Sequence, residues 1–195
     1  MKILALILAR GGSKRLRNKN ILKLKKKPLI IWTIKFAQNL PHITDILVST
    51  DDKKIATIAK NNRAFVPWLR PKSLSGDKTP ASSAAMHALK WYEKKIKKID
   101  GILLLQPTSP FRSLKVFKKV IKLYKKNFNK NYVSVSKTYS NSYKPNGSLY
   151  LISPSKFKKN KTFITKDAIG VLVKTKKEQV DIDYKSDLDI AKRLI

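Results

Sequence analysis

The chain has 195 residues, 42% of them hydrophobic, which is enough for one α/β domain with a substantial core. It contains no cysteine, which excludes disulfides and thiolate metal sites. Lysine and arginine number 44 against 12 acidic residues, so the formal net charge is +32. Such an excess is typical of a nucleic-acid binder or a membrane-surface protein, or of a lysine-rich, AT-biased genome.

The distribution of the lysines favours the compositional interpretation. They are spread over predicted helix faces, for example at 94–98 and 118–126, and do not gather beside aromatic residues. RNA-binding modules normally carry aromatic platforms or arginines that read bases. We therefore expect no specific nucleic-acid partner and no membrane partner, although the positive field would attract polyanions such as nucleotides.

The first predicted element is a buried strand over the apolar run 3–8. This N-terminus superficially resembles a signal peptide, but the apolar run is short and ends at a basic loop instead of a small-residue cleavage site. No run in the sequence approaches the ~20 apolar residues of a membrane span. We expect a cytoplasmic protein.

A basic, glycine-containing loop at 10–20 follows this strand. Gly11 and Gly12 let the backbone approach an anion, and Ser13, Lys14 and Lys19 add a hydroxyl and two cations. The loop lacks the spacing of a P-loop, and glycine favours turns in general, so an ordinary turn explains the two glycines equally well. Its position after the first strand, where open α/β sheets bind ligands, favours a phosphate cradle.

Strands and helices alternate along the rest of the chain, which predicts one domain over 1–195. The expected architecture is a three-layer α/β fold with a mixed, mostly parallel sheet, and an antiparallel edge among the strands of 132–173. Pro28 is expected at the first position of a helix, and the last helix is expected to be capped near Ser186. The expected helices are 28–40, 53–61, 80–92, 113–128 and 186–195, and the later strands are 45–50, 64–66, 100–105, 132–136, 147–152 and 169–173.

Polar side chains follow several of these strands. The pair at 51–52 ends one strand, Gln106 ends another, and Asp181 and Asp183 precede the last helix. Strand ends on one edge of such a sheet converge on one crevice. An amide can pair with a nucleobase edge, and two carboxylates spaced i, i+2 can hold Mg²⁺. With the basic loop, this set predicts phosphoryl or nucleotidyl transfer.

Each of these features also has a structural interpretation. The pair at 51–52 is more often an N-cap for the next helix. The segment 106–110 can be a rigid loop, and Asp181 and Asp183 can be solvated residues before a helix. His42 and His87 have no partner motif, so we interpret both as structural or surface residues. The functional interpretation depends on the joint order of the motifs along the chain.

That order resembles the acylneuraminate cytidylyltransferases, the CMP-sialic acid synthetases. Bacterial relatives that activate legionaminic or pseudaminic acid share the same signatures. The motifs include the Arg-Gly-Gly-Ser-Lys-Arg segment at 10–15 and the Gln-Pro-Thr-Ser-Pro-Phe-Arg segment at 106–112, and their combination is more specific than any one of them. In chain order, the matching segments are 8–20, 28–30, 48–51, 70–71, 104–112, 145–150, 181–183 and 187–188, so that the resemblance extends along nearly the whole chain.

The resemblance implies a nucleotidyltransferase fold and a transfer of CMP from CTP to a nonulosonic acid. The anomeric hydroxyl of the acid attacks the α-phosphorus, and pyrophosphate leaves. It implies that Arg10, Ser13, Lys14, Lys19 and Asn20 hold the phosphates, with Arg10 and Lys19 offsetting charge on the leaving pyrophosphate.

The resemblance also assigns the remainder of the site. Arg70, Ser82 and Gln106 would contact the nucleoside, and Asp181 and Asp183 would hold Mg²⁺. The expected catalytic residues are Arg10, Lys19 and Asp183. The sugar acid would lie near Gln106, Thr108, Ser109 and Asn146.

One departure from the family concerns the acceptor side. Relatives usually carry a long insertion before the Pro-Asn-Gly segment, which forms a dimerisation arm and supplies basic residues to the partner's sugar site. Here residues 137–146 form the whole connection, within ordinary loop lengths, as an abbreviated remnant of that arm. Lys137, Tyr139, Tyr143 and Lys144 are candidates to replace the missing contacts.

Because this connection is short, the sequence does not decide whether the usual homodimer forms. Two alternative functions also stay open. One is a nucleotidyltransferase for another 2-keto-3-deoxy sugar acid. The other is a non-catalytic homologue that binds nucleotides or nucleic acid through its basic surface. The family implies a role in surface glycans such as lipopolysaccharide or capsule.

Overall fold

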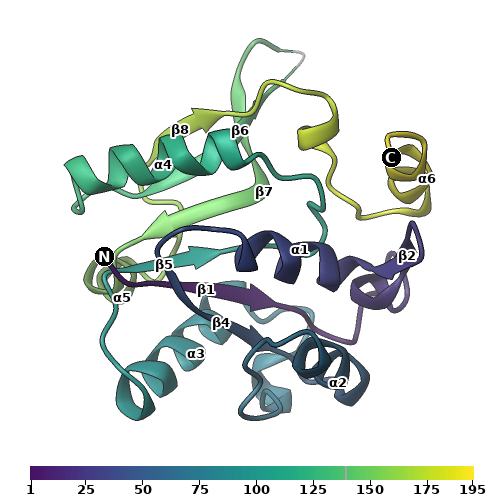
Figure 1. The fold of residues 1–195 in the computed structure, drawn as a ribbon, viewed down its shortest axis with the longest axis horizontal. Helices are drawn as coiled ribbons and strands as arrows, with labels where there is room; N and C mark the ends of the chain where they lie inside the picture. The colour runs from purple at the N-terminus through teal and green to yellow at the C-terminus, as the bar shows by residue number, and fades with distance from the viewer. Residues whose placement is uncertain (139) are drawn as a thin grey trace.

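The computed structural model describes residues 1–138 and 140–195, and shows a six-stranded sheet between layers of helices (Figure 1). Tyr139 lies outside the described residues. The strand order is β4-β1-β5-β7-β6-β8. The strands are β1 (Ile3–Leu8), β4 (Ile43–Ser49), β5 (Gly101–Leu104), β6 (Tyr132–Lys137), β7 (Tyr143–Ile152) and β8 (Ile169–Leu172).

The sheet is mixed and mostly parallel, as predicted, but its antiparallel strand is not at an edge. β1 pairs in parallel with β4 and β5, and β6 pairs in parallel with β8. β7 lies between β5 and β6 and is antiparallel to both. The predicted antiparallel edge is therefore wrong. β6 and β7 are joined by a short turn, which permits only an antiparallel pair, and β7 then returns to the middle of the sheet.

Helices cover both faces of the sheet because the strand side chains alternate. On β1, Ile3, Ala5 and Ile7 share one buried cluster with α1, α2 and α4, whereas Leu4 and Leu6 share another with α3 and α5. The helices are α1 (Leu29–Gln38), α2 (Lys53–Asn61), α3 (Ala81–Lys95), α4 (Leu114–Lys126) and α5 (Pro154–Asn160), with 3₁₀ turns at η1 (Lys19–Ile21), η2 (Lys72–Leu74) and η3 (Lys177–Gln179).

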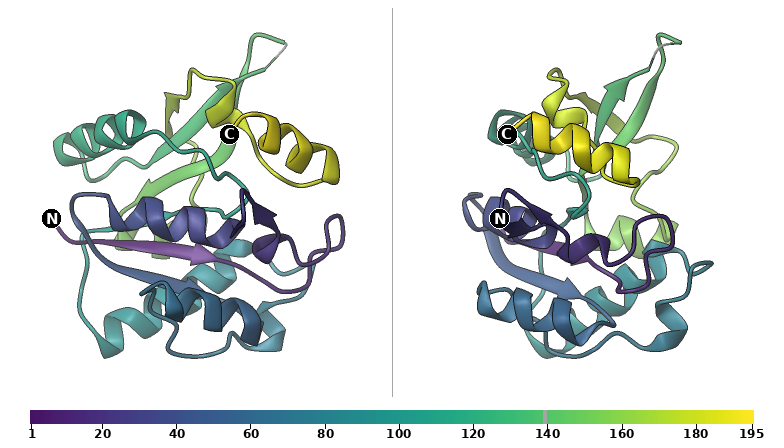
Figure 2. Two further views of the ribbon diagram at one scale, coloured as in Figure 1. Left: turned by 45° about the vertical axis from the view of Figure 1, so that its right-hand side comes forward. Right: turned by 90° about the vertical axis from the view of Figure 1, so that its right-hand side faces the viewer.

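The C-terminal helix α6 (Lys185–Arg193) packs against the segment 22–32 (Figures 1 and 2). Its buried Leu188 joins Leu24 and Leu29 in a third apolar cluster beside the small hairpin of β2 (Lys23–Leu24) and β3 (Lys27–Pro28). The predicted cap near Ser186 is wrong, because the helix begins at Lys185. The Asp187 carboxylate instead accepts from backbone N–H groups just before the helix.

Two further expectations from the sequence change in the structure. Half of the predicted polar connection 137–146 is strand, because β6 runs on to Lys137 and β7 begins at Tyr143. These strand ends stand away from the body of the domain in both views (Figures 1 and 2). The predicted strand 64–66 is reduced to a single bridge between Leu47 and Phe65, because Pro67 cannot donate a ladder hydrogen bond. No helix of the described residues is long and apolar enough to span a membrane.

Candidate active site

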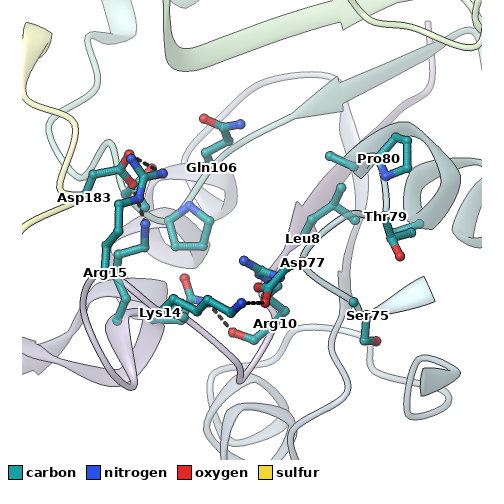
Figure 3. A pocket seen from close by; sticks show the side chains of 18 of the residues that line it. Leu8, Arg10, Lys14, Arg15, Ser75, Asp77, Thr79, Pro80, Gln106 and Asp183 are labelled. Atoms are coloured by element: carbon teal, nitrogen blue, oxygen red, sulfur yellow. Dashed lines mark hydrogen bonds and ion pairs between the residues drawn. The ribbon is translucent and has the colours of Figure 1, made fainter. Parts of the chain in front are cut away.

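A cavity of about 690 Å³ lies at the carboxyl ends of the three parallel strands β4, β1 and β5 (Figure 3). The register places Leu8 of β1 beside Ser49 of β4, and Leu6 beside Leu104 of β5, so the loops after these strands emerge together. Most of the predicted site residues line this cavity. They are Arg10, Ser13, Lys14, Lys19, Asn20, Arg70, Gln106, Thr108, Asp181 and Asp183.

The basic loop 10–20 is held in place by residues 51–52, which follow β4. The backbone N–H of Gly11 donates to Asp51 Oδ1 at 3.1 Å. A Cβ added to Gly11 would lie 2.8 Å from Asp52 Oδ2, so only glycine allows this close approach. Asp52 itself caps α2 by accepting two backbone N–H bonds, which confirms the structural interpretation of this pair. The Asn20 amide donates to Arg10 O at 2.8 Å and closes the loop.

Two carboxylates bind the cations of this loop in pairs, and Figure 3 shows both groups. Arg10 Nη1 lies 2.7 Å from Asp77 Oδ1, and Lys14 Nζ lies 2.8 Å from Asp77 Oδ2. The hydrogen bond from Lys14 is the main cause of a lowered Asp77 pKa, so this carboxyl is ionised at neutral pH. Arg10 and Lys14 therefore lie close together without a bound anion, because the Asp77 carboxylate contacts both of them.

The second carboxylate is Asp183. Lys19 Nζ lies 2.5 Å from its Oδ1, and Arg15 Nη2 lies 2.9 Å from its Oδ2. Arg15 also lies over the Tyr184 ring, with its guanidinium carbon 5.2 Å from the centroid. The segment before α6 thereby joins the basic loop across one side of the cavity.

Asp181 and Asp183 are positioned by the loop after β5. The N–H of Ile182 donates to Thr108 O at 2.8 Å. Burial raises the pKa of Asp181, and the charge of Asp183 raises it further, while a hydrogen bond from Thr108 opposes both effects. A hard cation that prefers oxygen ligands would relieve this crowding of negative charge.

This donor set fits Mg²⁺, which in nucleotide enzymes takes one or two carboxylates and completes its shell with waters and phosphates. Within residues 1–138 and 140–195, His, Asp and Glu side chains form no cluster of three or more that could hold a metal alone. Asp181 and Asp183 match the one or two carboxylates that a protein supplies to Mg²⁺ in such sites.

Arg70 and Gln106 both line the cavity. Arg70 is buried, and burial is the main cause of its lowered pKa, while its Nε donates to Ser75 Oγ at 3.1 Å. The Gln106 side chain passes close to Gly147, which has a φ of 78°. A Cβ at Gly147 would lie 2.5 Å from Gln106 Oε1, so this glycine leaves room for the amide.

Arg112 holds the loop after β5 that carries Gln106. It donates to the carbonyl of Gln106, to Ser148 O at 2.9 Å and to Thr33 Oγ1 at 3.0 Å. Burial lowers its pKa, and the charge of Asp181 acts in the opposite direction. One partly buried guanidinium thus joins the loop after β5, strand β7 and helix α1.

Three predicted site residues are not in the cavity lining: Ser82, Ser109 and Asn146. The Asn146 amide is used inside the β6–β7 hairpin, where Oδ1 accepts from Ser134 Oγ at 2.6 Å and Nδ2 donates to Ser136 Oγ at 3.1 Å. Ser109 is buried and donates to Asn146 O at 3.2 Å. Ser82 lies in the first turn of α3. Their substrate-binding roles stay predictions.

Sequence reasoning missed three residues of this site. Arg15 and Asp77 line the cavity and form ion pairs with other charged residues that line it. Arg112 donates a hydrogen bond to the Gln106 carbonyl. Arg15 and Arg112 belong to the basic and Gln-Pro-Thr-Ser motifs, so their positions carried a signal. Asp77 had none, because it lies outside every segment that matches the family pattern. Lys137, Tyr143 and Lys144 lie on the projecting hairpin, and Tyr139 lies outside the described residues.

Comparisons with known proteins agree with this geometry. The family model for cytidylyltransferases matches residues 4–191. The chain is 33% identical to CMP-N,N'-diacetyllegionaminic acid synthase of Legionella pneumophila, over all of this chain and 97% of that protein. It is 31% identical to N-acylneuraminate cytidylyltransferase of Escherichia coli, over 97% of this chain and 51% of that protein.

A solved structure of CMP:2-keto-3-deoxy-manno-octonic acid synthetase complexed with CTP shares the fold, with a TM-score of 0.77 at 13% identity. The similarity covers all of this chain and 98% of that one. The family match over nearly the whole chain agrees with a cavity built from a basic loop, a glutamine and paired carboxylates. The chain is a nucleotidyltransferase and belongs to the cytidylyltransferase family.

Proposed function

We propose that this protein transfers CMP from CTP to the anomeric hydroxyl of a nonulosonic, sialic-acid-like acid and releases pyrophosphate. The observation that carries this proposal is the convergence of four cations, the Gln106 amide and the Asp181–Asp183 pair on one cavity. Relatives named as legionaminic, pseudaminic and N-acylneuraminic acid enzymes support the acceptor class.

In this proposal the basic loop holds the triphosphate. Arg10, Ser13, Lys14 and Lys19 face the cavity, and Arg10 and Lys19 offset the charge that develops on the leaving pyrophosphate. Asn20 acts by fixing the loop, because its amide is already bonded to the Arg10 carbonyl. Positioned cations of this kind stabilise the transition state because they need no reorganisation during the reaction.

Asp181 and Asp183 would hold Mg²⁺, which supplies a positive charge that neutralises phosphate oxygens and orients them. Lys19 and Arg15, which now contact Asp183, would then be available to phosphate oxygens. Asp181, with its pKa raised by burial, gains most from a neighbouring cation.

Nucleoside recognition falls to Arg70, Gln106 and the start of α3 near Ser82. The Gln106 amide can accept and donate to a base edge, and the Arg112 contact fixes the loop that carries it. The acceptor would lie beyond Thr108, toward Ser109 and Asn146 under the β6–β7 hairpin. The buried hydrogen bonds of Ser109 and Asn146 give them a supporting role around the acceptor.

A pyrophosphate-release assay with CTP, Mg²⁺ and a panel of nonulosonic acids tests the proposal. We expect release with at least one legionaminic-, pseudaminic- or sialic-type acid, and none without acceptor. If no nonulosonic acid supports pyrophosphate release and a different 2-keto-3-deoxy acid does, this proposal is wrong. The second candidate function, a nucleotidyltransferase for another 2-keto-3-deoxy sugar acid, would then replace it. The short β6–β7 connection and the octonic acid synthetase fold favour that candidate.

We propose further that the reaction takes place in the cytoplasm and that the CMP-sugar is used for a surface glycan such as lipopolysaccharide or capsule. The alignment with the Legionella relative spans 225 positions while this chain has 195 residues, so at least 225 − 195 = 30 positions of the relative have no counterpart here. We infer that the missing length is the dimerisation arm, and that any homodimer forms without it.

A further inference from the structure

Asp77 is the one carboxylate of the cavity that the proposed chemistry does not use. It lies in the loop between η2 and α3, and its two oxygens contact two different cations, Arg10 Nη1 at 2.7 Å and Lys14 Nζ at 2.8 Å. Figure 3 shows Arg10 and Lys14 converging on it from the basic loop. A carboxylate placed this way presents the same pair of acceptors as two oxygens of a phosphate.

The loop keeps its conformation through bonds that do not involve the Asp77 side chain. The Thr79 N–H donates to Gly76 O at 3.1 Å, and the Thr79 hydroxyl donates to Ser73 O at 3.3 Å. The Ser75 hydroxyl donates to Pro71 O at 3.0 Å. The Asp77 side chain is 38% exposed, and exposed ion pairs contribute little to stability. The loop therefore does not need the contacts of the Asp77 side chain to keep its conformation.

The contacts of Asp77 conflict with triphosphate binding. The proposed function assigns Arg10 and Lys14 to the phosphates of CTP, and each of these cations is already engaged by Asp77. A carboxylate left beside a triphosphate would also repel it. Asp183 differs, because Mg²⁺ would take over its charge, whereas Asp77 must leave the two cations.

We infer that Asp77 is an internal substitute for phosphate. It occupies Arg10 and Lys14 in the nucleotide-free enzyme, moves away when CTP binds, and returns to these cations as pyrophosphate leaves. This inference rests on the proposed function, because it takes the basic loop to be the triphosphate site. The consequence is that Asp77 weakens the binding of CTP and pyrophosphate and speeds release of the product.

Titration calorimetry with inorganic pyrophosphate and with CTP, both with Mg²⁺ at fixed ionic strength, tests the inference. Asp77→Asn removes the charge and keeps the shape, and Asp77→Glu keeps the charge. Asp167→Asn is the matched control, because Asp167 also bridges two lysines but is not in the cavity lining. Asp77→Ser repeats the test if the asparagine variant does not fold, and melting curves establish which variants are folded.

We expect Asp77→Asn to bind pyrophosphate and CTP about tenfold more tightly, as for the loss of one contacting like charge. The inhibition constant for pyrophosphate should fall by the same factor, whereas Asp77→Glu and Asp167→Asn should behave like the wild type. Equal or weaker pyrophosphate binding by folded Asp77→Asn overturns the inference, and so does a wild-type protein that binds no pyrophosphate. If the wild type binds pyrophosphate but not CTP, the proposed function fails while the Asp77 comparison still gives a result.

Discussion

Replacing Arg112 by lysine tests how the site is supported. The guanidinium donates to the carbonyls of Gln106 and Ser148 and to the Thr33 hydroxyl, from a partly buried position. A lysine ammonium is a single point donor and cannot reproduce this fork. We therefore expect one or two buried acceptors to lose their partner.

Each buried unsatisfied polar group costs about 1–3 kcal/mol, so the variant should lose about 2–5 kcal/mol of unfolding free energy. For a chain of this length, each 1 kcal/mol lowers the melting temperature by roughly 2–4 °C, which predicts a fall of about 4–20 °C. Because the Gln106 loop loses its support, the KM for CTP should rise more than kcat falls.

Calorimetric melting and steady-state kinetics measure these two effects. Arg63→Lys is the control, since Arg63 is exposed just after α2, and it should melt within about 1 °C of the wild type because isolated surface substitutions change little. If Arg112→Lys melts with this control and keeps the wild-type KM for CTP, the assignment of Arg112 as the support of the Gln106 loop is wrong.

Three further predictions concern the carboxylates and the glycine of the site and one surface ion pair. Asp183→Asn should lower kcat at least about 100-fold, because Mg²⁺ loses a charged ligand, and full activity would refute the metal assignment. Gly147→Ala should raise the KM for CTP and lower the melting temperature, because its Cβ would clash with Gln106 Oε1 at a φ of 78°; crystals of the variant with an unmoved Gln106 would contradict this. Hydrogen bonds from Lys156 depress the pKa of Asp167 in the folded protein. Ionised Asp167 therefore stabilises the protein above its unfolded pKa of about 3.9, and this stability is lost as the pH falls toward the folded pKa. Melting temperatures of wild type and Asp167→Asn should thus converge as pH falls from 6 to below about 3; a constant difference would refute the linkage.

The sequence was sufficient for the layers of the fold and for most of the cavity lining. Alternating apolar residues on β1 fixed both faces of the sheet, and the parallel register brought Arg10 and Gln106 to one edge, as strand ends in such sheets do. Helix α5 was missed although it carries a start signal, Ser153 before Pro154, because its seven residues show too little periodicity.

Contacts between segments that are far apart in the chain could not be predicted from the sequence. Asp77, in the loop between η2 and α3, contacts Arg10 of the basic loop, and no local pattern indicates that pairing. Asn146 was predicted near the sugar because of its motif, yet its amide is consumed inside the hairpin, which only the β6–β7 register determines. The place of β7 within the sheet likewise depends on tertiary packing.

The most direct test of the central claim is calorimetric titration of the protein with CTP in the presence of Mg²⁺, beside a titration with RNA across a range of salt concentrations. We expect one saturable CTP site that requires Mg²⁺ and is lost in Asp183→Asn, with no specific RNA affinity. Steeply salt-dependent RNA binding without any CTP binding would contradict it, and would identify the positive charge as a nucleic-acid surface.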